Sequence, residues 1–156
     1  MPPLLYLIRH ADAEDGADDS ARPLSKRGRH QIDELARFLS RSGAFQPAEI
    51  WHSPLVRARE TADLLRHGLK LHAKHQVVPE LTPDSDPGLV AGRLGACLVP
   101  LALVGHEPHL GRLASMLVVG RAEPVVFLVK KAAVIALEPG GLRWCVRWHV
   151  SPEVIQ

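Results

Sequence analysis

The chain has 156 residues, 46% of them hydrophobic, which suits one domain with one sizeable core. Its 19 basic and 17 acidic residues leave a formal net charge of +2, so we expect no non-specific binding to nucleic acid or to a membrane. The two cysteines form no CxxC pair, which disfavours a disulfide framework or a cysteine zinc site, and the absence of a signal-like or membrane-spanning start predicts a cytoplasmic protein.

The first part of the chain predicts a strand, a helix and a second strand. Leu4 to Ile8 is a continuous apolar run, which is typical of a strand covered on both faces of a parallel sheet. After an acidic loop, apolar residues recur at helical spacing between Ser25, the expected N-terminal cap, and Gly43, the expected end. The segment AEIWHS then predicts a short strand.

Two more helices and a strand are expected in the middle of the chain. The next helix is predicted to have Ser53 as its cap and Pro54 at its first position, where the missing N–H costs nothing, and to end at Gly68. The segment HQVVPEL predicts a strand. A helix capped by Asp86 is expected to follow, although its glycines weaken that helix.

The last part of the chain changes character. LALV predicts a buried strand, and Pro108 is expected to open a further helix. VVFLV and AAVIALE then predict two strands before a turn. In the final segment, apolar residues alternate with polar ones, which predicts a half-exposed strand at a sheet edge; these apolar residues are Leu142, Trp144, Val146 and Trp148.

The order of these elements indicates the fold class. Strands and helices alternate four times before the final strands, and such alternation favours a parallel sheet with helices on both faces. We therefore expect a three-layer α/β/α fold with a mostly parallel sheet and an antiparallel edge. Residues 1–156 contain no internal repeat or interdomain linker, so a single domain is predicted.

Each of the four predicted parallel strands ends near a polar group. Because the carboxyl ends of parallel strands lie on one edge of a sheet, where ligands bind, these side chains are expected to converge. The expected helix starts at Pro54 and Pro108 point their N–H groups to the same edge. Two arginines and two histidines there suit a dianionic phosphoryl group, since the arginine fork matches phosphate oxygens. The candidate site residues are Arg9, His10, Arg57, Glu80 and His106.

Several motifs together resemble the histidine phosphatase superfamily, also called the phosphoglycerate-mutase-like superfamily. The resemblance covers the whole chain, and the short length and the tail are most similar to the SixA-type phosphohistidine phosphatase branch. Ala11 stands where many members have glycine. The segments that carry the resemblance are LIRHADAE, RPLSKRG, SPLVRARETA, PELTP, LVGHEPHLGRLASML and VKKAAVIALE.

The resemblance implies a phosphoglycerate-mutase-like fold and a role for each candidate residue. His10 would attack phosphorus as a neutral imidazole and carry the phosphoryl group, while its other ring nitrogen donates to a nearby carbonyl. Arg9, Arg57 and His106 would bind the equatorial oxygens, so that no metal or other cofactor is implied. Glu80 would protonate the leaving group; a solvated loop carboxylate is an equally good interpretation of that residue.

Three functions remain open at this point. The first is a phosphatase that removes phosphate from phosphohistidine on a protein. The second is a phosphatase for small phosphomonoesters such as sugar phosphates, and the third is a phosphate-binding module without turnover. The connections around Gly68–Val78 and Glu80–Leu101 are too short for an inserted helical lid, which predicts an open site that admits a phosphorylated protein. The oligomeric state is not predicted.

Overall fold

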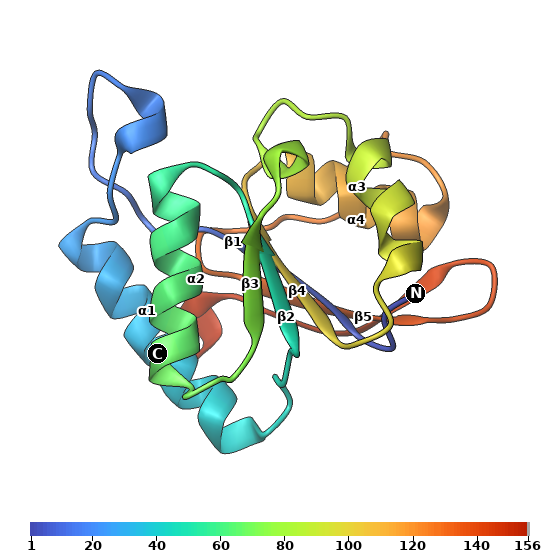
Figure 1. Ribbon diagram of the computed structural model, residues 1–156, viewed down its shortest axis with the longest axis horizontal. Coiled ribbons are helices and arrows are strands. Elements are labelled where there is room, and N and C mark those ends of the chain that lie inside the picture. Colours follow the sequence, from blue (N-terminus) through green and yellow to red (C-terminus); the bar gives the residue numbers. More distant parts are fainter. Residues whose placement is uncertain (156) are drawn as a thin grey trace.

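The computed structural model describes residues 1–155 and has three layers, with a mixed sheet between two pairs of helices (Figure 1). Helices α1 and α2 pack together on one face of the sheet, and α3 and α4 pack together on the other. The α-helices are α1 (Lys26–Ser42), α2 (Val56–Gly68), α3 (Pro87–Arg93) and α4 (His109–Val119). The short 3-10 helices are η1 (Asp19–Ala21), η2 (Pro79–Leu81), η3 (Leu94–Ala96) and η4 (Pro152–Val154).

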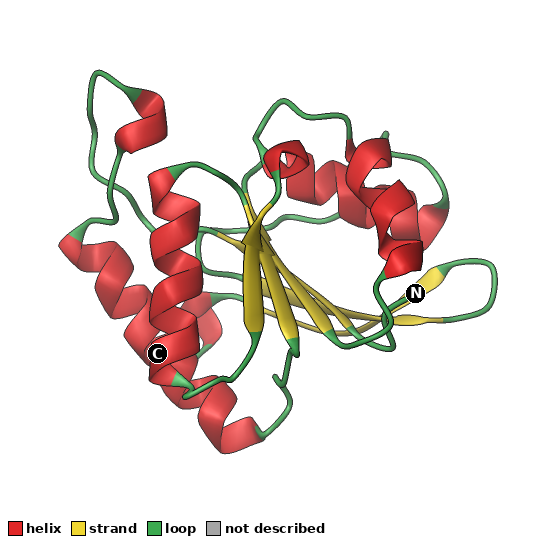
Figure 2. Cartoon of the chain, viewed as in Figure 1, coloured by secondary structure: helices red, strands yellow, loops and turns green. Residues whose placement is uncertain are grey.

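The six strands of the sheet lie in the order β3-β2-β4-β1-β5-β6 (Figure 2). The first four in this order are parallel to one another, whereas β5 is antiparallel to β1 and β6 is antiparallel to β5. The predicted fold class is therefore confirmed. The strands are β1 (Leu5–Arg9), β2 (Glu49–His52), β3 (Lys74–Val77), β4 (Leu101–Gly105), β5 (Val134–Pro139) and β6 (Trp144–Val150).

The caps predicted for α1 and α3 are present. The Ser25 hydroxyl accepts a hydrogen bond from the Gly28 N–H at the start of α1. At the other end, Gly43 adopts a φ of 64°, a left-handed conformation that glycine reaches without steric cost. The Asp86 carboxylate likewise accepts from the Gly88 N–H and begins α3.

The predicted start of α2 is wrong. The helix begins at Val56, two residues after Pro54, and Leu55 at its N-terminal cap provides no side-chain hydrogen bond. The Ser53 hydroxyl instead accepts from the Leu55 N–H and is bonded to His106. A side chain from another strand end therefore engages the serine that the sequence assigns to helix capping.

The predicted strand at residues 125–129 is also absent. This segment is a loop beside α4, where the Val126 N–H donates to the Ser115 hydroxyl. Val129 is buried, whereas Val126 and Leu128 are exposed. Both sides of β1 are already paired, with β4 and with β5, so the segment has no place beside that central strand.

A bulge divides the aromatic residues of β6 between the two faces of the sheet. Trp148 is paired with Ala136 and Val146 with Leu137, which leaves Arg147 without a partner on β5. Trp144 consequently packs into the core beneath α3 and α4, while Trp148 packs against the core beneath α1 and α2. The predicted half-exposed strand at the sheet edge is confirmed, but the extra residue reverses its alternation, so its apolar side chains do not all share one face.

The central strands are buried on both faces. Every residue of β4 is buried, and in β1 only Arg9 is partly exposed. The polar groups at the carboxyl ends of these strands are therefore anchored in the buried centre of the sheet. Within residues 1–155, no helix combines the length and the apolar character needed to cross a bilayer.

Candidate active site

His10 directly follows β1 and is held by backbone on both sides. Its N–H donates to the Gly105 carbonyl at the end of β4, and its side chain is only 7% exposed. The ring Nδ1 lies 2.6 Å from the Ala11 carbonyl oxygen. A carbonyl can only accept, so Nδ1 carries the proton and Nε2 carries the free lone pair.

The electrostatic environment keeps the His10 ring neutral. Burial, with a smaller effect of the positive charges of Arg57, Arg9 and Lys131, lowers the pKa of His10 to about 4, against the raising effect of the Ala11 carbonyl. Imidazole ordinarily titrates near 6.5. At neutral pH the Nε2 lone pair is therefore available, without another residue to remove a proton.

His106 faces His10 from the end of the neighbouring strand. It follows Gly105 of β4, is 1% exposed, and its ring centroid lies 5.0 Å from that of His10. Its Nε2 lies 2.7 Å from the Ser53 hydroxyl. Burial, followed by repulsion from a protonated His10 and from the Arg57 charge, lowers the pKa of His106 to about 3, so this ring is also neutral at neutral pH.

Two arginines complete this group. Arg9 is the last residue of β1 and donates from Nη1 to the Val129 carbonyl at 3.0 Å. Arg57 lies in the first turn of α2, is 5% exposed, and donates from both terminal nitrogens to Asp19 of η1. In the described chain, three buried nitrogens of the group have no partner: Arg9 Nε, Arg57 Nε and His106 Nδ1.

The unpartnered nitrogens indicate what the site can bind. Arginine Nε always carries a hydrogen, and buried donors usually have an acceptor. If the Ser53 hydroxyl donates to Nε2 of His106, then Nδ1 of that ring also carries a proton. A tetrahedral oxyanion in contact with these side chains would supply acceptors that the protein does not.

Two buried hydroxyl groups support the site, and the sequence did not identify either as a site residue. Thr61 accepts from the Ala11 N–H at 3.1 Å and donates to the Arg57 carbonyl at 2.8 Å, which joins the loop after His10 to α2. Ser53 fixes His106 from the end of β2. The only signal for them was their place in the motif SPLVRARETA, in which Ser53 was interpreted as a helix cap.

Glu80 lies apart from this group. It belongs to η2, after the edge strand β3, and its carboxylate is 3.0 Å from Arg93 of α3. Among the described residues it forms no hydrogen bond with His10, Arg9, Arg57 or His106. The structure thus brings together four of the five predicted residues, and the role of Glu80 as proton donor stays a prediction.

Glu107 is a second carboxyl group beside the site. It follows His106 directly, and its Oε1 accepts from the Gly111 N–H at 2.6 Å. Burial raises the pKa of Glu107, against the lowering effects of that hydrogen bond and of the Arg9 charge. A half-buried carboxyl that holds its proton more readily than usual has the character of a general acid.

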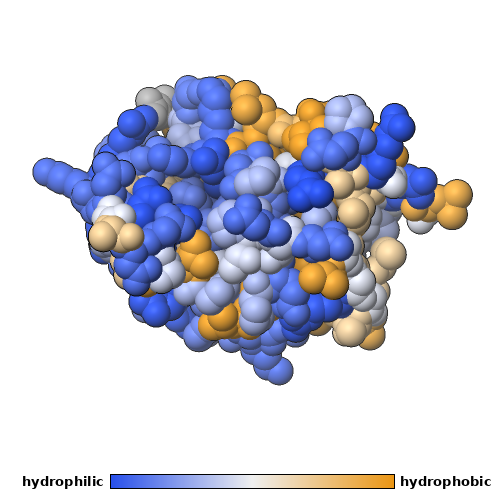
Figure 3. Space-filling model, turned by 90° about the horizontal axis from the view of Figure 1, so that it is seen from above, coloured by the Kyte–Doolittle hydropathy of each residue, from blue (hydrophilic) through white to orange (hydrophobic). Residues whose placement is uncertain are grey.

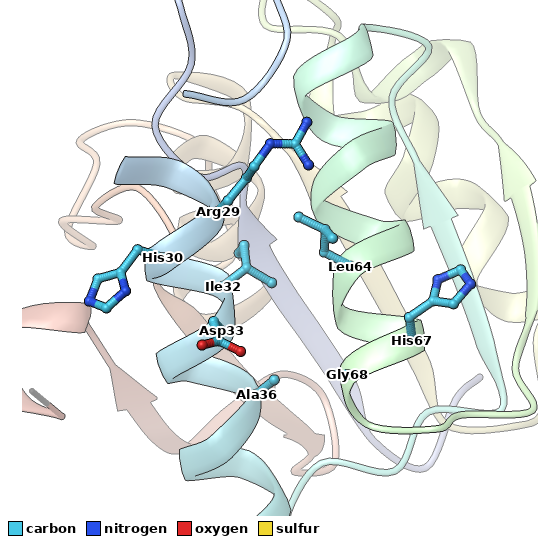
Figure 4. A pocket seen from close by; sticks show the side chains of 8 residues that line it. All are labelled: Arg29, His30, Ile32, Asp33, Ala36, Leu64, His67 and Gly68. Atoms are coloured by element: carbon cyan, nitrogen blue, oxygen red, sulfur yellow. The ribbon is translucent and has the colours of Figure 1, made fainter. Parts of the chain in front are cut away.

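The surroundings of the site are polar. Seen from the side at which the parallel strands end, the surface is mostly hydrophilic (Figure 3). A separate hollow of about 450 Å³ lies between α1 and α2, where Ile32 and Leu64 point towards each other beneath Arg29 (Figure 4). It contains none of the candidate residues. In residues 1–155, no three His, Cys, Asp or Glu side chains form a group that could hold a metal ion.

Known proteins share both the sequence pattern and the fold. The model of the histidine phosphatase superfamily (branch 1) matches residues 5–82. Phosphohistidine phosphatase SixA of Escherichia coli (strain K12) is 31% identical over 95% of this chain and 93% of its own length. The chain belongs to the histidine phosphatase superfamily. Its resemblance to that superfamily and to the SixA branch, predicted from the motifs, is therefore confirmed.

Solved structures agree with this assignment. The protein histidine phosphatase SixA complexed with tungstate superimposes with a TM-score of 0.87 at 28% identity, covering 98% of this chain and 99% of the other. The structure of a putative α-ribazole-5'-P phosphatase from Escherichia coli superimposes with a TM-score of 0.81 at 19% identity, covering 97% of this chain and 98% of the other. At that identity the likeness shows the fold alone.

Proposed function

We propose that this protein is a phosphatase that forms a phosphohistidine at His10 and acts on phosphohistidine carried by another protein. The observation that carries the proposal is the hydrogen bond from Nδ1 of His10 to the Ala11 carbonyl. It leaves the opposite nitrogen as a neutral nucleophile next to Arg9, Arg57 and His106. The assignment to the histidine phosphatase superfamily supports the same chemistry.

The reaction would take place in two transfers. Nε2 of His10 forms a bond to phosphorus as the bond from phosphorus to the leaving nitrogen breaks, and that nitrogen takes up a proton. Water then attacks the phosphohistidine, which releases inorganic phosphate and restores neutral His10. Arg9, Arg57 and His106 would donate to the equatorial oxygens in both steps. Such positioning and charge stabilisation are what phosphoryl transfer chiefly requires.

Two carboxyl groups compete for the role of proton donor. Glu80, the residue predicted from the sequence, would first have to separate from Arg93. Glu107 is half-buried with a raised pKa and directly follows His106. Comparing Glu80→Gln with Glu107→Gln on a substrate with a basic leaving group distinguishes them, since loss of the donor lowers kcat most where the leaving group needs a proton.

An open site supports a protein substrate. Only residues 69–73 connect α2 to β3, and the longer connection from β3 to β4 contains α3 between two 3-10 helices. We infer that 1–156 is one domain without a lid subdomain. Such a site holds a small sugar phosphate by few contacts but admits a phosphorylated side chain. The likeness to SixA supports this choice, and its tungstate complex supports binding of a tetrahedral oxyanion.

Kinetics on two classes of substrate test the proposal. In excess EDTA, we expect kcat/KM for a phosphohistidine on a protein domain to exceed that for small phosphomonoesters by about 100-fold, equivalent to about 2.7 kcal/mol of transition-state stabilisation. His10→Asn should keep the fold and lose both activities. Equal or reversed preference would assign the protein to small phosphomonoesters. Binding of phosphate without any turnover would make it a binding module.

A further inference from the structure

A basic hollow of about 340 Å³ adjoins the candidate active site through Arg9. It lies between the start of α1, the loop after His10, the loop before β5 and η4. Apart from Arg9, none of its lining residues has a role in the proposed function. Its lining residues are Arg9, Asp12, Arg27, Gln31, Lys130, Lys131, Pro152 and Glu153.

The hollow has a surplus of positive charge. Four basic side chains line it against two acidic ones. Lys131 is paired with Asp12 at 2.8 Å and Lys130 with Glu153 at 2.5 Å. In the described part of the chain, Arg27 has no ion-pair partner, and Arg9 donates only to a backbone carbonyl. Because Arg9 would also contact the phosphoryl group, Arg27 supplies the positive charge that is left for a second anion in the hollow, beside the paired Lys130 and Lys131.

The hollow adjoins the catalytic group and shares the charge of Arg9 with it. Arg9 belongs to both, and Asp12 lies two residues beyond His10. The charge of Lys131 reaches far enough to lower the pKa of His10. Because Arg9 lines the hollow and also belongs to the catalytic group, a protein with its phosphoryl group at His10 would have a neighbouring part of its surface next to the hollow.

We propose that this hollow binds an acidic side chain, Asp or Glu, that flanks the phosphorylated histidine of the substrate protein. The proposal rests on the proposed function, because it assigns the substrate of that same site. A carboxylate suits the arginine and lysine donors. Arg27, Lys130 and Glu153 are exposed, and an exposed rim of long charged side chains recognises a protein surface better than it encloses a small molecule.

Two matched peptides, called the twins, measure how much the hollow contributes to substrate recognition. Both carry one phosphohistidine, flanked by glutamates in one peptide and by glutamines in the other. At low salt we expect the wild type to hydrolyse the glutamate peptide with a kcat/KM about tenfold higher, and Arg27→Glu to remove this preference. Arg41→Glu is the matched control, because Arg41 is exposed on the same helix about 21 Å further along. It should keep the preference.

A binding measurement separates failure of this inference from failure of the proposed function. Fluorescence anisotropy with the unphosphorylated twins needs no turnover, and the wild type should bind the glutamate peptide about tenfold more tightly. If neither phosphopeptide is hydrolysed while this difference persists, the proposed function fails and the acidic subsite stands. Wild-type protein that does not discriminate the twins in either assay overturns the subsite. Free glutamate that binds as tightly as the peptide would assign the hollow to a small acid, which also overturns it.

Discussion

Arg57 donates a hydrogen bond to Asp19 from each of its terminal nitrogens. Nη1 donates to the backbone carbonyl at 2.8 Å, and Nη2 donates to the carboxylate at 3.2 Å. The two ends of this contact differ in environment. The Arg57 side chain is 6% exposed, whereas that of Asp19 is 66% exposed in η1, at the end of the acidic loop. The carboxylate therefore occupies donors that an incoming phosphoryl group would use.

Replacing Asp19 by asparagine should make substrate binding tighter. An ion pair with one exposed partner contributes up to about 1 kcal/mol, so removal of the competing charge should lower KM for p-nitrophenyl phosphate by up to about fivefold. We expect kcat to change less than twofold. Steady-state kinetics and the inhibition constant of inorganic phosphate measure this. A higher KM in Asp19→Asn would instead show that Asp19 holds Arg57 in its productive orientation.

Ser53→Ala should impair catalysis more than folding. The change removes the hydroxyl that holds Nε2 of His106 at 2.7 Å, and a lost buried hydrogen bond costs about 0.5–1.5 kcal/mol. We expect kcat to fall by about three- to tenfold, with a changed ¹⁵N shift of the His106 ring. Ser115→Ala is the matched control, because Ser115 is equally buried and bonds to Val126 away from the site. It should lose stability and keep kcat. A Ser53→Ala enzyme with unchanged kcat and ring shifts would contradict the positioning role.

The free energy of unfolding should fall as the pH drops below about 6.5. Burial lowers the pKa of His10 to about 4, of His106 to about 3 and of His109 to about 4. Between 6.5 and these values the unfolded chain binds protons that the native protein does not, so acid favours unfolding. Each buried histidine contributes up to about 1.4 kcal/mol per pH unit, and the loss ends once the folded rings are protonated.

Urea unfolding from pH 7.5 to 4.5 measures this dependence. His10→Asn should reduce the slope of unfolding free energy against pH by the contribution of one histidine. His72→Asn, which removes an exposed ring between α2 and β3, should leave the slope unchanged. An equal slope in wild type and His10→Asn would show that His10 titrates alike in the folded and unfolded protein, which contradicts a lowered pKa.

Gly28→Ala should destabilise the protein and weaken the site. A Cβ at Gly28 would lie 2.0 Å from the Asp12 carbonyl oxygen, which is backbone of the loop directly after His10. We expect a loss of about 1–3 kcal/mol, the usual range for overpacking, together with lower kcat because that loop must move. Gly92→Ala is the matched helical control. Nothing lies within 4 Å of its Cβ, and it should gain up to about 1 kcal/mol. Thermal unfolding of both variants checks this, and wild-type stability of Gly28→Ala would contradict it.

The sequence predicted what depends on local pattern and on the geometry of parallel sheets. The apolar run before Arg9 and the caps Ser25 and Gly43 were sufficient for the first strand and helix. The edge of the sheet then brought His10 and His106 together, as expected of parallel strands. These features follow from spacing along the chain.

Features that depend on contacts between residues distant in the sequence could not be predicted from local sequence patterns. Ser53 resembles a helix cap until His106 engages it, and Trp144 and Trp148 share a face only until a bulge intervenes. The apolar segment at residues 125–129 lacks a strand partner because β1 is paired on both sides. The ion pair between Glu80 and Arg93 likewise joins residues 13 apart that no local pattern connects.

The most direct test of the account is the chemical identity of the phosphorylated enzyme. Rapid mixing with ³²P-labelled substrate and quenching in alkali should trap label on the wild type, on Nε2 of His10. This label should be stable in base and lost in acid, and it should be absent from His10→Asn. Ser53 is the alternative nucleophile because its hydroxyl contacts His106, although the residue is fully buried. Label that survives acid and is lost in alkali, located on Ser53, would contradict the account.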